Sequence, residues 1–210
     1  VSAQQRMARV IRDQSIVRTE RKYTPAQLRS TIEANTNADN TDKMPGSLPP
    51  DISKGVNDAA TKFGISASYL DSTIMREYGG VLAKTPGKYD VKADTSSATG
   101  LLQFTDDTFL RLAKDPSYSF ALGVTRDMTD TQILDMRKDP QKSILAGAML
   151  AKQNKSAMET ALGRPVTDTE LYMAHFLGAP QATKFLQTVQ TNPEASAATL
   201  FPTEAASNPE

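Results

Sequence analysis

The chain of 210 residues contains no cysteine and a single histidine, His175. The lack of cysteine excludes a disulfide framework, a thiolate nucleophile and a cysteine-based zinc site. One histidine without cysteine also leaves no cluster of metal ligands at the usual spacing. No glycine-rich phosphate loop is present either. We therefore expect no metal site and no cofactor.

Long apolar runs and an overall charge are also missing. No segment is apolar over the length needed to cross a membrane, and no secretory hydrophobic region is found. The formal net charge is zero, which gives no global attraction to nucleic acid or to an acidic membrane. We therefore expect no nucleic-acid partner and no membrane span. The first residue is Val rather than Met, as in a processed product or a piece of a longer protein.

The charges that are present are unevenly distributed. Residues 1–30 carry seven basic and two acidic side chains, a net charge of +5. Residues 3–20 place apolar side chains at helical spacing among the arginines, namely Met7, Val10, Ile11 and Val17. This pattern predicts a basic helical arm over residues 1–34. The arm is either a docking element or a solvated helix packed on the rest of the protein.

Turn-forming residues separate the arm from a helical region. Residues 35–50 are polar and rich in Asn, Asp, Gly and Pro, which is typical of a linker. The following region shows helical periodicity, helix caps and glycine stops, without an internal repeat or a strong strand pattern. Residues 191–210 are small, polar and contain proline, and we expect a poorly ordered tail there. The predicted fold class is a mainly α domain over residues 51–190.

Start and stop signals place the first helices. Asp51 and Gly64 bracket a helix whose apolar face comprises Ile52, Val56, Ala60 and Phe63. A second helix is predicted over residues 67–78. Residues 81–99 have weak periodicity, so we expect a loop there with at most a small β excursion.

Other signals place the later helices. Asp139-Pro140 is expected to open a long helix that runs to about residue 154. Ser156 with Glu159, and Thr167 with Glu170, have the spacing of a capping box and predict two more helix starts. Gly163 and Gly178 are expected to end helices, and Pro180 opens the last one.

The predicted helix over residues 67–78 places a carboxylic acid beside apolar residues. Leu70, Ile74 and Glu77 fall at i, i+4 and i+7 and therefore share one face, and Gly79-Gly80 predicts the helix end. Burial and the negative end of the helix dipole both disfavour a charged carboxylate there. Glu77 either reaches solvent or pairs with a Lys or Arg at a fraying end, or it is a general acid with a raised pKa.

Two later segments hold further candidates. Gly100-Leu101-Leu102-Gln103 precedes Thr105, which is expected to cap a helix. Alone, this pattern indicates only a loop that enters a helix. His175 lies four residues after Leu171, so both side chains point the same way on a helix. A single histidine on an apolar face is typical of a core residue.

Together, these three segments resemble the soluble lytic transglycosylase (goose-type lysozyme-like) domains that cut peptidoglycan. In that family, a Glu at a helix end precedes a G-L-M-Q segment and, later, an A-Y-N-A-G segment. Glu77 matches the Glu, residues 100–103 match G-L-M-Q, and residues 174–178 occupy the place of A-Y-N-A-G. The resemblance covers about residues 52–190 and is strongest to the phage and phage-like branch, whose domains are carried on virion proteins.

Some positions depart from the family pattern. Tyr78 replaces the usual Ser, Leu102 replaces Met, His175 stands where the family has a Tyr beside the acid, and Phe176 replaces Asn. The loop over residues 81–95 is longer than the family pattern leads us to expect.

The resemblance implies a lysozyme-like fold and a peptidoglycan lytic transglycosylase. Glu77 would be the catalytic residue, and it would cleave the bond between N-acetylmuramic acid and N-acetylglucosamine with formation of a 1,6-anhydro ring. Six substrate-binding residues are implied, namely Ser97, Gly100, Leu102, Gln103, Tyr172 and His175. The implied partners are peptidoglycan glycan strands and, through residues 1–34, other virion proteins. The implied location is a virion, as a phage tail or ejected protein that acts on the cell wall in the periplasm.

Other functions stay open at this stage. A hydrolase (lysozyme) would need a second acid across the cleft, and the candidates are Asp90, Asp94, Asp106 and Asp107. A glycan-binding module without activity, or a structural or ejection protein of a virion that carries the domain as a passenger, would also fit.

Overall fold

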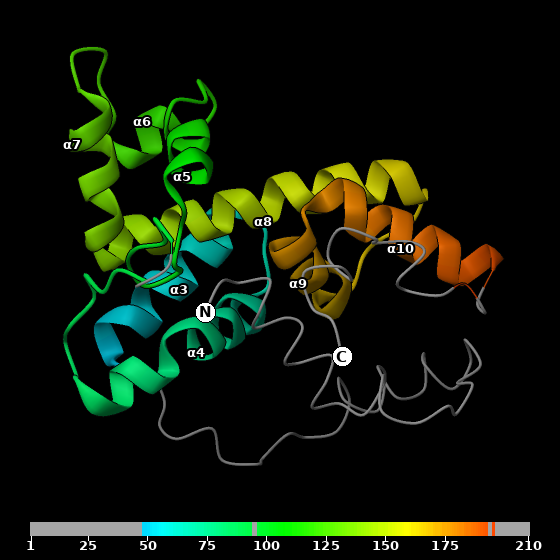
Figure 1. The fold of residues 1–210 in the computed structure, drawn as a ribbon, viewed down its shortest axis with the longest axis horizontal. Coiled ribbons are helices and arrows are strands. Elements are labelled where there is room, and N and C mark those ends of the chain that lie inside the picture. Colours follow the sequence, from blue (N-terminus) through cyan, green and yellow to red (C-terminus); the bar gives the residue numbers. More distant parts are fainter. Residues whose placement is uncertain (1–47, 94–95, 193–194, 196–210) are drawn as a thin grey trace. The chain divides into compact units, whose positions relative to one another are not determined.

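The computed structural model describes residues 48–93, 96–192 and 195 (Figure 1). The predicted arm over residues 1–34, most of the linker and almost all of the tail lie outside these described residues. The described chain is mainly α-helical, which confirms the predicted class, and its regular structure consists of helices α3 to α10 and one 3₁₀ helix, η1. Within these ranges the β structure is limited to the isolated bridges Lys92–Thr99 and Thr99–Phe104.

The described residues divide into two compact units within helix α8 (Pro140–Leu162). The first unit ends at Gln153 and contains α3 to α7, η1 and the first part of α8. The second unit begins at Asn154 and contains the end of α8 with α9 (Asp168–Leu177) and α10 (Ala179–Thr191). The single domain predicted over residues 51–190 stays a prediction.

Helix α3 (Pro50–Phe63) contacts helix α4 (Ala67–Lys84) in the first unit (Figure 1). It buries the predicted apolar face of Ile52, Val56, Ala60 and Phe63. It ends, as predicted, at Gly64, whose φ of 66° lies in the left-handed region. It begins one residue earlier than predicted, and Leu48 just before it is buried.

The prediction that the Glu77 helix ends at Gly79-Gly80 is wrong, because α4 continues to Lys84. Glycine disfavours a helix by only about 0.5–1 kcal/mol relative to alanine. Beyond the two glycines, the apolar side chains of Val81 and Leu82 are half-buried, and burial of apolar surface can offset a cost of this size. Glu77 is therefore followed by about two further turns of helix and does not lie at the negative end of the dipole.

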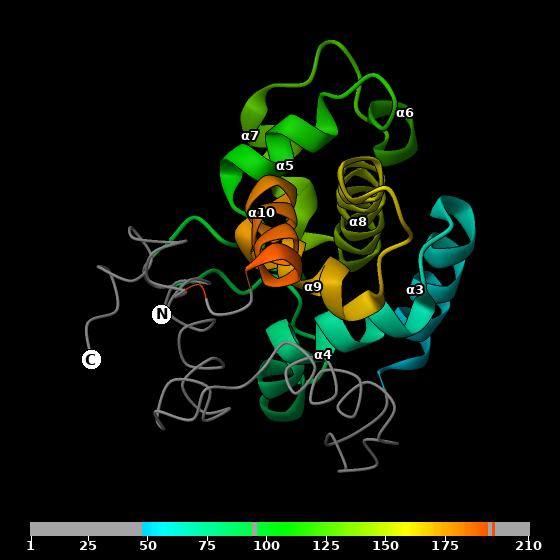
Figure 2. The same ribbon diagram turned by 90° about the vertical axis from the view of Figure 1, so that its right-hand side faces the viewer.

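A second group of helices in the first unit follows the loop after α4. These are α5 (Asp106–Ala113), α6 (Ser119–Leu122), α7 (Asp130–Asp135) and η1 (Met136–Lys138). Helix α5 contacts both α6 and α7, and the three lie together in Figures 1 and 2. Helix α5 follows Thr105 as predicted, but the hydroxyl of Thr105 donates to that of Thr108 and caps no backbone N–H.

Helix α8 opens at Pro140 as predicted but extends to Leu162 instead of ending near residue 154. The predicted helix start at Ser156 is therefore wrong, because Ser156 lies inside α8. Its partner in the proposed capping box, Glu159, forms an ion pair of 2.8 Å with Lys155 on the preceding turn. Such an i, i+4 pair supports a continuous helix. Gly163 follows the helix end with a φ of 67°.

The second unit has an apolar cluster at its centre. Helices α9 and α10 contact each other, and Met158, Ala174, Ala179 and Ala182 are buried together. The predicted capping box of Thr167 and Glu170 is confirmed at the start of α9. Pro180 lies in the first turn of α10, as predicted.

Candidate functional site

The candidate acid and its neighbour lie on α4 in the first unit. Glu77 is partly buried, and Tyr78 is 1% exposed. The phenol of Tyr78 donates to the carbonyl oxygen of Lys88 at 2.6 Å and accepts from the backbone N–H of Val91 at 3.4 Å. Burial raises the pKa of Tyr78 above its ordinary value, with smaller effects from the Val91 N–H, which lowers it, and from Asp90 and Tyr89, which raise it. The phenol therefore stays protonated and can donate at neutral pH.

Gln103 is tied to the same stretch of loop. Its side-chain Nε2 donates to the carbonyl oxygens of Val91 at 3.1 Å and Gly100 at 2.7 Å. The backbone N–H of Gly100 also donates to Val91, at 3.0 Å. Val91 thus joins the residue that follows Glu77 to the turn that carries Gln103. The structure brings two of the three predicted motifs together through one backbone position.

The turn itself requires unusual backbone angles. Gln103 has a φ of 49°, and among the described residues it is the non-glycine residue with a positive φ. Gly100 has a φ of 82°, and a Cβ placed there would lie 1.9 Å from the carbonyl oxygen of Arg137. Only glycine satisfies both the angle and the space. Gly100 is therefore required by the geometry of the turn.

Ser97 and Leu102 have mainly structural contacts. The hydroxyl of Ser97 accepts from the backbone N–H of Asp106 at 3.1 Å, at the start of α5. Leu102 is 2% exposed, and its side chain fills the space beside Gly147, where a Cβ would meet it at 2.3 Å. Its backbone N–H donates to the hydroxyl of the buried Ser143 at 3.2 Å. The side chain of Leu102 thus belongs to the core, and a sugar contact of either residue stays a prediction.

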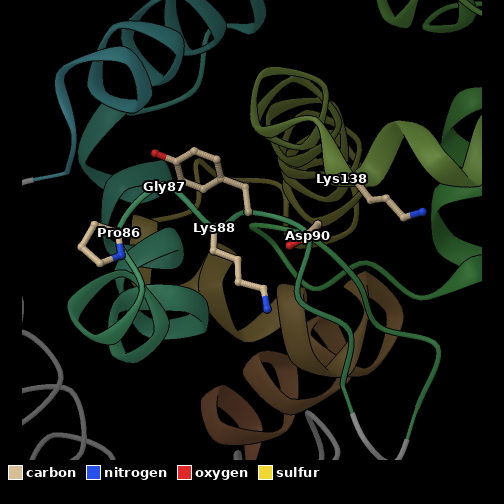
Figure 3. A pocket seen from close by; sticks show the side chains of 6 residues that line it. Pro86, Gly87, Lys88, Asp90 and Lys138 are labelled. Carbon is tan, nitrogen blue, oxygen red and sulfur yellow. The ribbon is translucent and has the colours of Figure 1, made fainter.

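An open hollow of about 530 Å³ lies beside the loop that Tyr78 holds (Figure 3). Residues 86–90 of the loop after α4 line it, together with Lys138 from η1. Lys138 pairs with Asp135 at 2.5 Å. The hollow includes Asp90, a candidate second acid, but none of the predicted substrate-binding residues lines it. Two lysines and one aspartate give the hollow charges of both signs, and these do not indicate a ligand class.

The remaining two predicted residues lie in the second unit, on α9. The rings of Tyr172 and His175 stack, with centroids 6.1 Å apart and planes at 8°. Burial lowers the pKa of His175 to about 4, so the imidazole is neutral at neutral pH. The family pattern, which has a Tyr beside the acid at this position, predicts that His175 lies near Glu77. The two residues belong to different units, and their proximity stays a prediction.

Arg137 is the main site residue that the sequence did not indicate. Its guanidinium donates to the carbonyl oxygens of Ser97 and Phe104 at 3.0 and 2.8 Å and pairs with Asp106 at 2.8 Å. These partners are 31 to 40 positions away in the sequence. Contacts over such separations leave no local pattern. Ser143 was also not indicated by the sequence, because its partner Leu102 is 41 positions away. The sequence shows only that a polar residue falls on the face of α8 that is buried.

In the ranges that the structure describes, no group of three or more His, Asp or Glu side chains could hold a metal ion. None of the described helices combines the length and the apolar character of a membrane span. In a comparison with known protein families, no family model matches this chain.

Proposed function

We propose that this protein is a peptidoglycan lytic transglycosylase with a lysozyme-like fold, and that Glu77 is its catalytic residue. The observation that carries the proposal is the pair of hydrogen bonds at Val91. Its backbone N–H donates to the phenol oxygen of Tyr78, the neighbour of Glu77, and its carbonyl oxygen accepts from the side chain of Gln103. Two motifs about 25 positions apart, matched to the family independently of the structure, are thereby parts of one arrangement in one compact unit.

The proposed chemistry uses one carboxyl group twice. Protonated Glu77 donates its proton to the glycosidic oxygen while the bond from that oxygen to C1 of N-acetylmuramic acid breaks. The acetamido oxygen of the same sugar bonds to C1 and stabilises the positive charge. The Glu77 carboxylate then takes the proton of the C6 hydroxyl, whose oxygen attacks C1 and displaces the acetamido oxygen. The products are a 1,6-anhydro sugar and a free 4-hydroxyl end, and no water is consumed.

A hydrolase is the less favoured alternative. Asp106, one of its candidate second acids, is paired with the buried Arg137 and lies in the first turn of α5. Asp107 is exposed in the same turn, where an acid stabilises the helix dipole. Asp90 is exposed at the hollow, and Asp94 lies outside the described residues. The two carboxylates on α5 thus have structural roles that account for them.

The test is mass spectrometry of purified peptidoglycan after digestion. A transglycosylase releases muropeptides that are lighter by one water than the hydrolytic products, whereas a lysozyme leaves reducing ends. Glu77→Gln should keep the fold and lower the rate by roughly 10²–10⁴-fold, because the amide cannot donate a proton as an acid. Glu159→Gln is the matched control, since Glu159 lies in the second unit and pairs with Lys155. We expect the control to digest peptidoglycan at the wild-type rate.

Hydrolytic products would contradict the proposal and show that the protein is a lysozyme. Binding of glycan without any cleavage would show that it is a binding module. Digestion by a folded Glu77→Gln protein at the wild-type rate would remove Glu77 from the mechanism. We further propose that the activity opens the cell wall locally for a phage particle. That part rests on the family branch alone, and detection of the protein in purified virions would test it.

A further inference from the structure

Arg137 is a buried cation placed against the turn that carries Gln103. Its side chain is 8% exposed. The Nε atom donates to the carbonyl oxygen of Leu134 at 3.0 Å, within the same short segment. The Nη1 atom reaches across to Ser97, Phe104 and Asp106. Ser97 lies before the Gly100–Gln103 turn, and Phe104 follows it directly, so one guanidinium contacts both ends of the turn.

The backbone of Arg137 also contacts the middle of the turn. Its carbonyl oxygen occupies the space beside Gly100 where any Cβ would lie. The residue therefore contacts the turn at its two ends through the side chain and at Gly100 through the main chain. The planar guanidinium fixes Nε and Nη1 relative to each other, so that Nε bonds Leu134 while Nη1 contacts the turn; a lysine ammonium has a single nitrogen and cannot reproduce this arrangement.

We propose that Arg137 is a positioning residue, whose guanidinium sets the place of Gln103 beside Val91 and the Glu77 helix. The inference rests on the proposed function, because it assigns Arg137 a role in substrate binding at that site. It does not make Arg137 essential for folding. The carbonyl oxygens of Phe104 and Ser97 each have a second donor, from the N–H and the hydroxyl of Thr99 respectively. Without the guanidinium, the turn keeps part of its hydrogen bonding and becomes looser.

The test compares Arg137→Lys and Arg137→Met with the control Arg111→Lys. Arg111 is exposed on α5 and donates to Gln153 at 3.1 Å. Steady-state kinetics on soluble glycan-strand fragments give KM and kcat. Hydrogen exchange reports the amide of Gly100, which donates to Val91, and that of Gln103, which donates to Gly100. Amides of α10 serve as the internal reference.

We expect both Arg137 variants to raise KM by about tenfold or more with a smaller change in kcat, because a small misplacement of a binding group is costly. Exchange at Gly100 and Gln103 should speed up by a similar factor, while α10 amides and the Arg111→Lys protein stay at wild-type values. Unchanged KM in folded Arg137 variants would overturn the inference, as would earlier melting with an unchanged rate per folded molecule. If the wild-type protein cuts no glycan, the proposed function fails and the site role of Arg137 falls with it. Exchange then still reports whether the guanidinium holds the turn.

Discussion

The turn around Gln103 and the helix pair of the second unit are stabilised by different forces. The turn is held by side chains that bond distant backbone atoms, chiefly Tyr78, Gln103 and Arg137. The helix pair is held by an apolar cluster around Met158 and by caps within one helix. Long-range polar contacts fix a particular backbone conformation, whereas apolar packing tolerates adjustment. The proposed site thus lies in the region whose backbone is fixed by long-range polar contacts.

The largest expected effect is a difference in stability between alanine substitutions at two glycines with similar backbone angles. Gly100→Ala should destabilise the protein by about 2–5 kcal/mol, because its Cβ would overlap the main chain of Arg137 at a positive φ. Gly163 has a φ of 67°, and nothing lies within 4 Å of its Cβ position, so Gly163→Ala should cost only about 1–2 kcal/mol. Urea unfolding of both variants measures the difference. Equal losses would mean that the turn is no more tightly fitted than a helix end.

The second prediction concerns pH and the helix pair. The pKa of His175 is about 4 in the folded protein, below its ordinary 6.5. Between these values the unfolded chain binds the proton first, so stability falls as pH drops from about 6.5 to 4, by on the order of 2–3 kcal/mol. Thermal unfolding across this range measures the loss. His175→Tyr should lose this dependence, since tyrosine does not titrate there.

Glu170, on the same helix as His175, affects stability mainly at lower pH, so the two contributions can be told apart. The pKa of Glu170 is lowered by Arg164 and the Thr167 N–H, against the opposing effect of burial. Its contribution to stability is present above its ordinary value of about 4.5 and is lost only as pH falls below that value. If the stability of the His175→Tyr protein still falls between pH 6.5 and 5, the pH dependence does not come from His175.

The third prediction concerns a substitution that should weaken the turn without changing its shape. Tyr78→Phe removes the hydrogen bonds to Lys88 and Val91 and should cost about 1–2 kcal/mol. Hydrogen exchange at the Gly100 amide should become faster, while the amides of α9 and α10 keep their wild-type rates. Uniform acceleration over both units would show that Tyr78 supports the whole protein and not the loop in particular.

The smallest expected effect is in the helix pair. Thr167→Ala removes the hydroxyl that accepts from the backbone N–H of Glu170 and should cost about 1 kcal/mol. Thr167→Ser is the control, since serine supplies the same acceptor and should restore most of the loss. Activity on peptidoglycan should be unchanged in both. A drop in turnover with Thr167→Ala would mean that the start of α9 contributes to the site.

The same contrast explains how far the sequence could predict the structure. Local signals were sufficient for the helix class, for the end of α3 at Gly64 and for the capping box at Thr167. They failed at Gly79-Gly80 and at Ser156, where weak local preferences gave way to the burial and side-chain pairing of a longer helix. Patterns of a few residues thus predicted where helices form better than where they end.

The candidate site was predictable only in part. The family resemblance named Glu77 and Gln103, and the structure places both in the first unit. The contacts of the residues around them were not visible in the sequence, because Arg137 donates to Ser97 across 40 positions and Val91 donates to Tyr78 across 13. Tyr78 was noted as a departure from the family, and its hydroxyl turns out to hold the loop. The roles in substrate binding of all six predicted residues stay predictions, namely Ser97, Gly100, Leu102, Gln103, Tyr172 and His175.

The side chain of Gln103 has a consequence for the polarity of any ligand. A carboxamide has two hydrogens on Nε2, and here both are directed at carbonyl oxygens, those of Val91 and Gly100. Carbonyl oxygens accept only, so these partners also fix which end of the amide is nitrogen. What remains for a ligand is the oxygen, which can only accept. If Gln103 binds the substrate as proposed, this conformation would select by hydrogen-bond direction: a sugar hydroxyl or an amide N–H would fit, whereas a bare carbonyl or carboxylate would not.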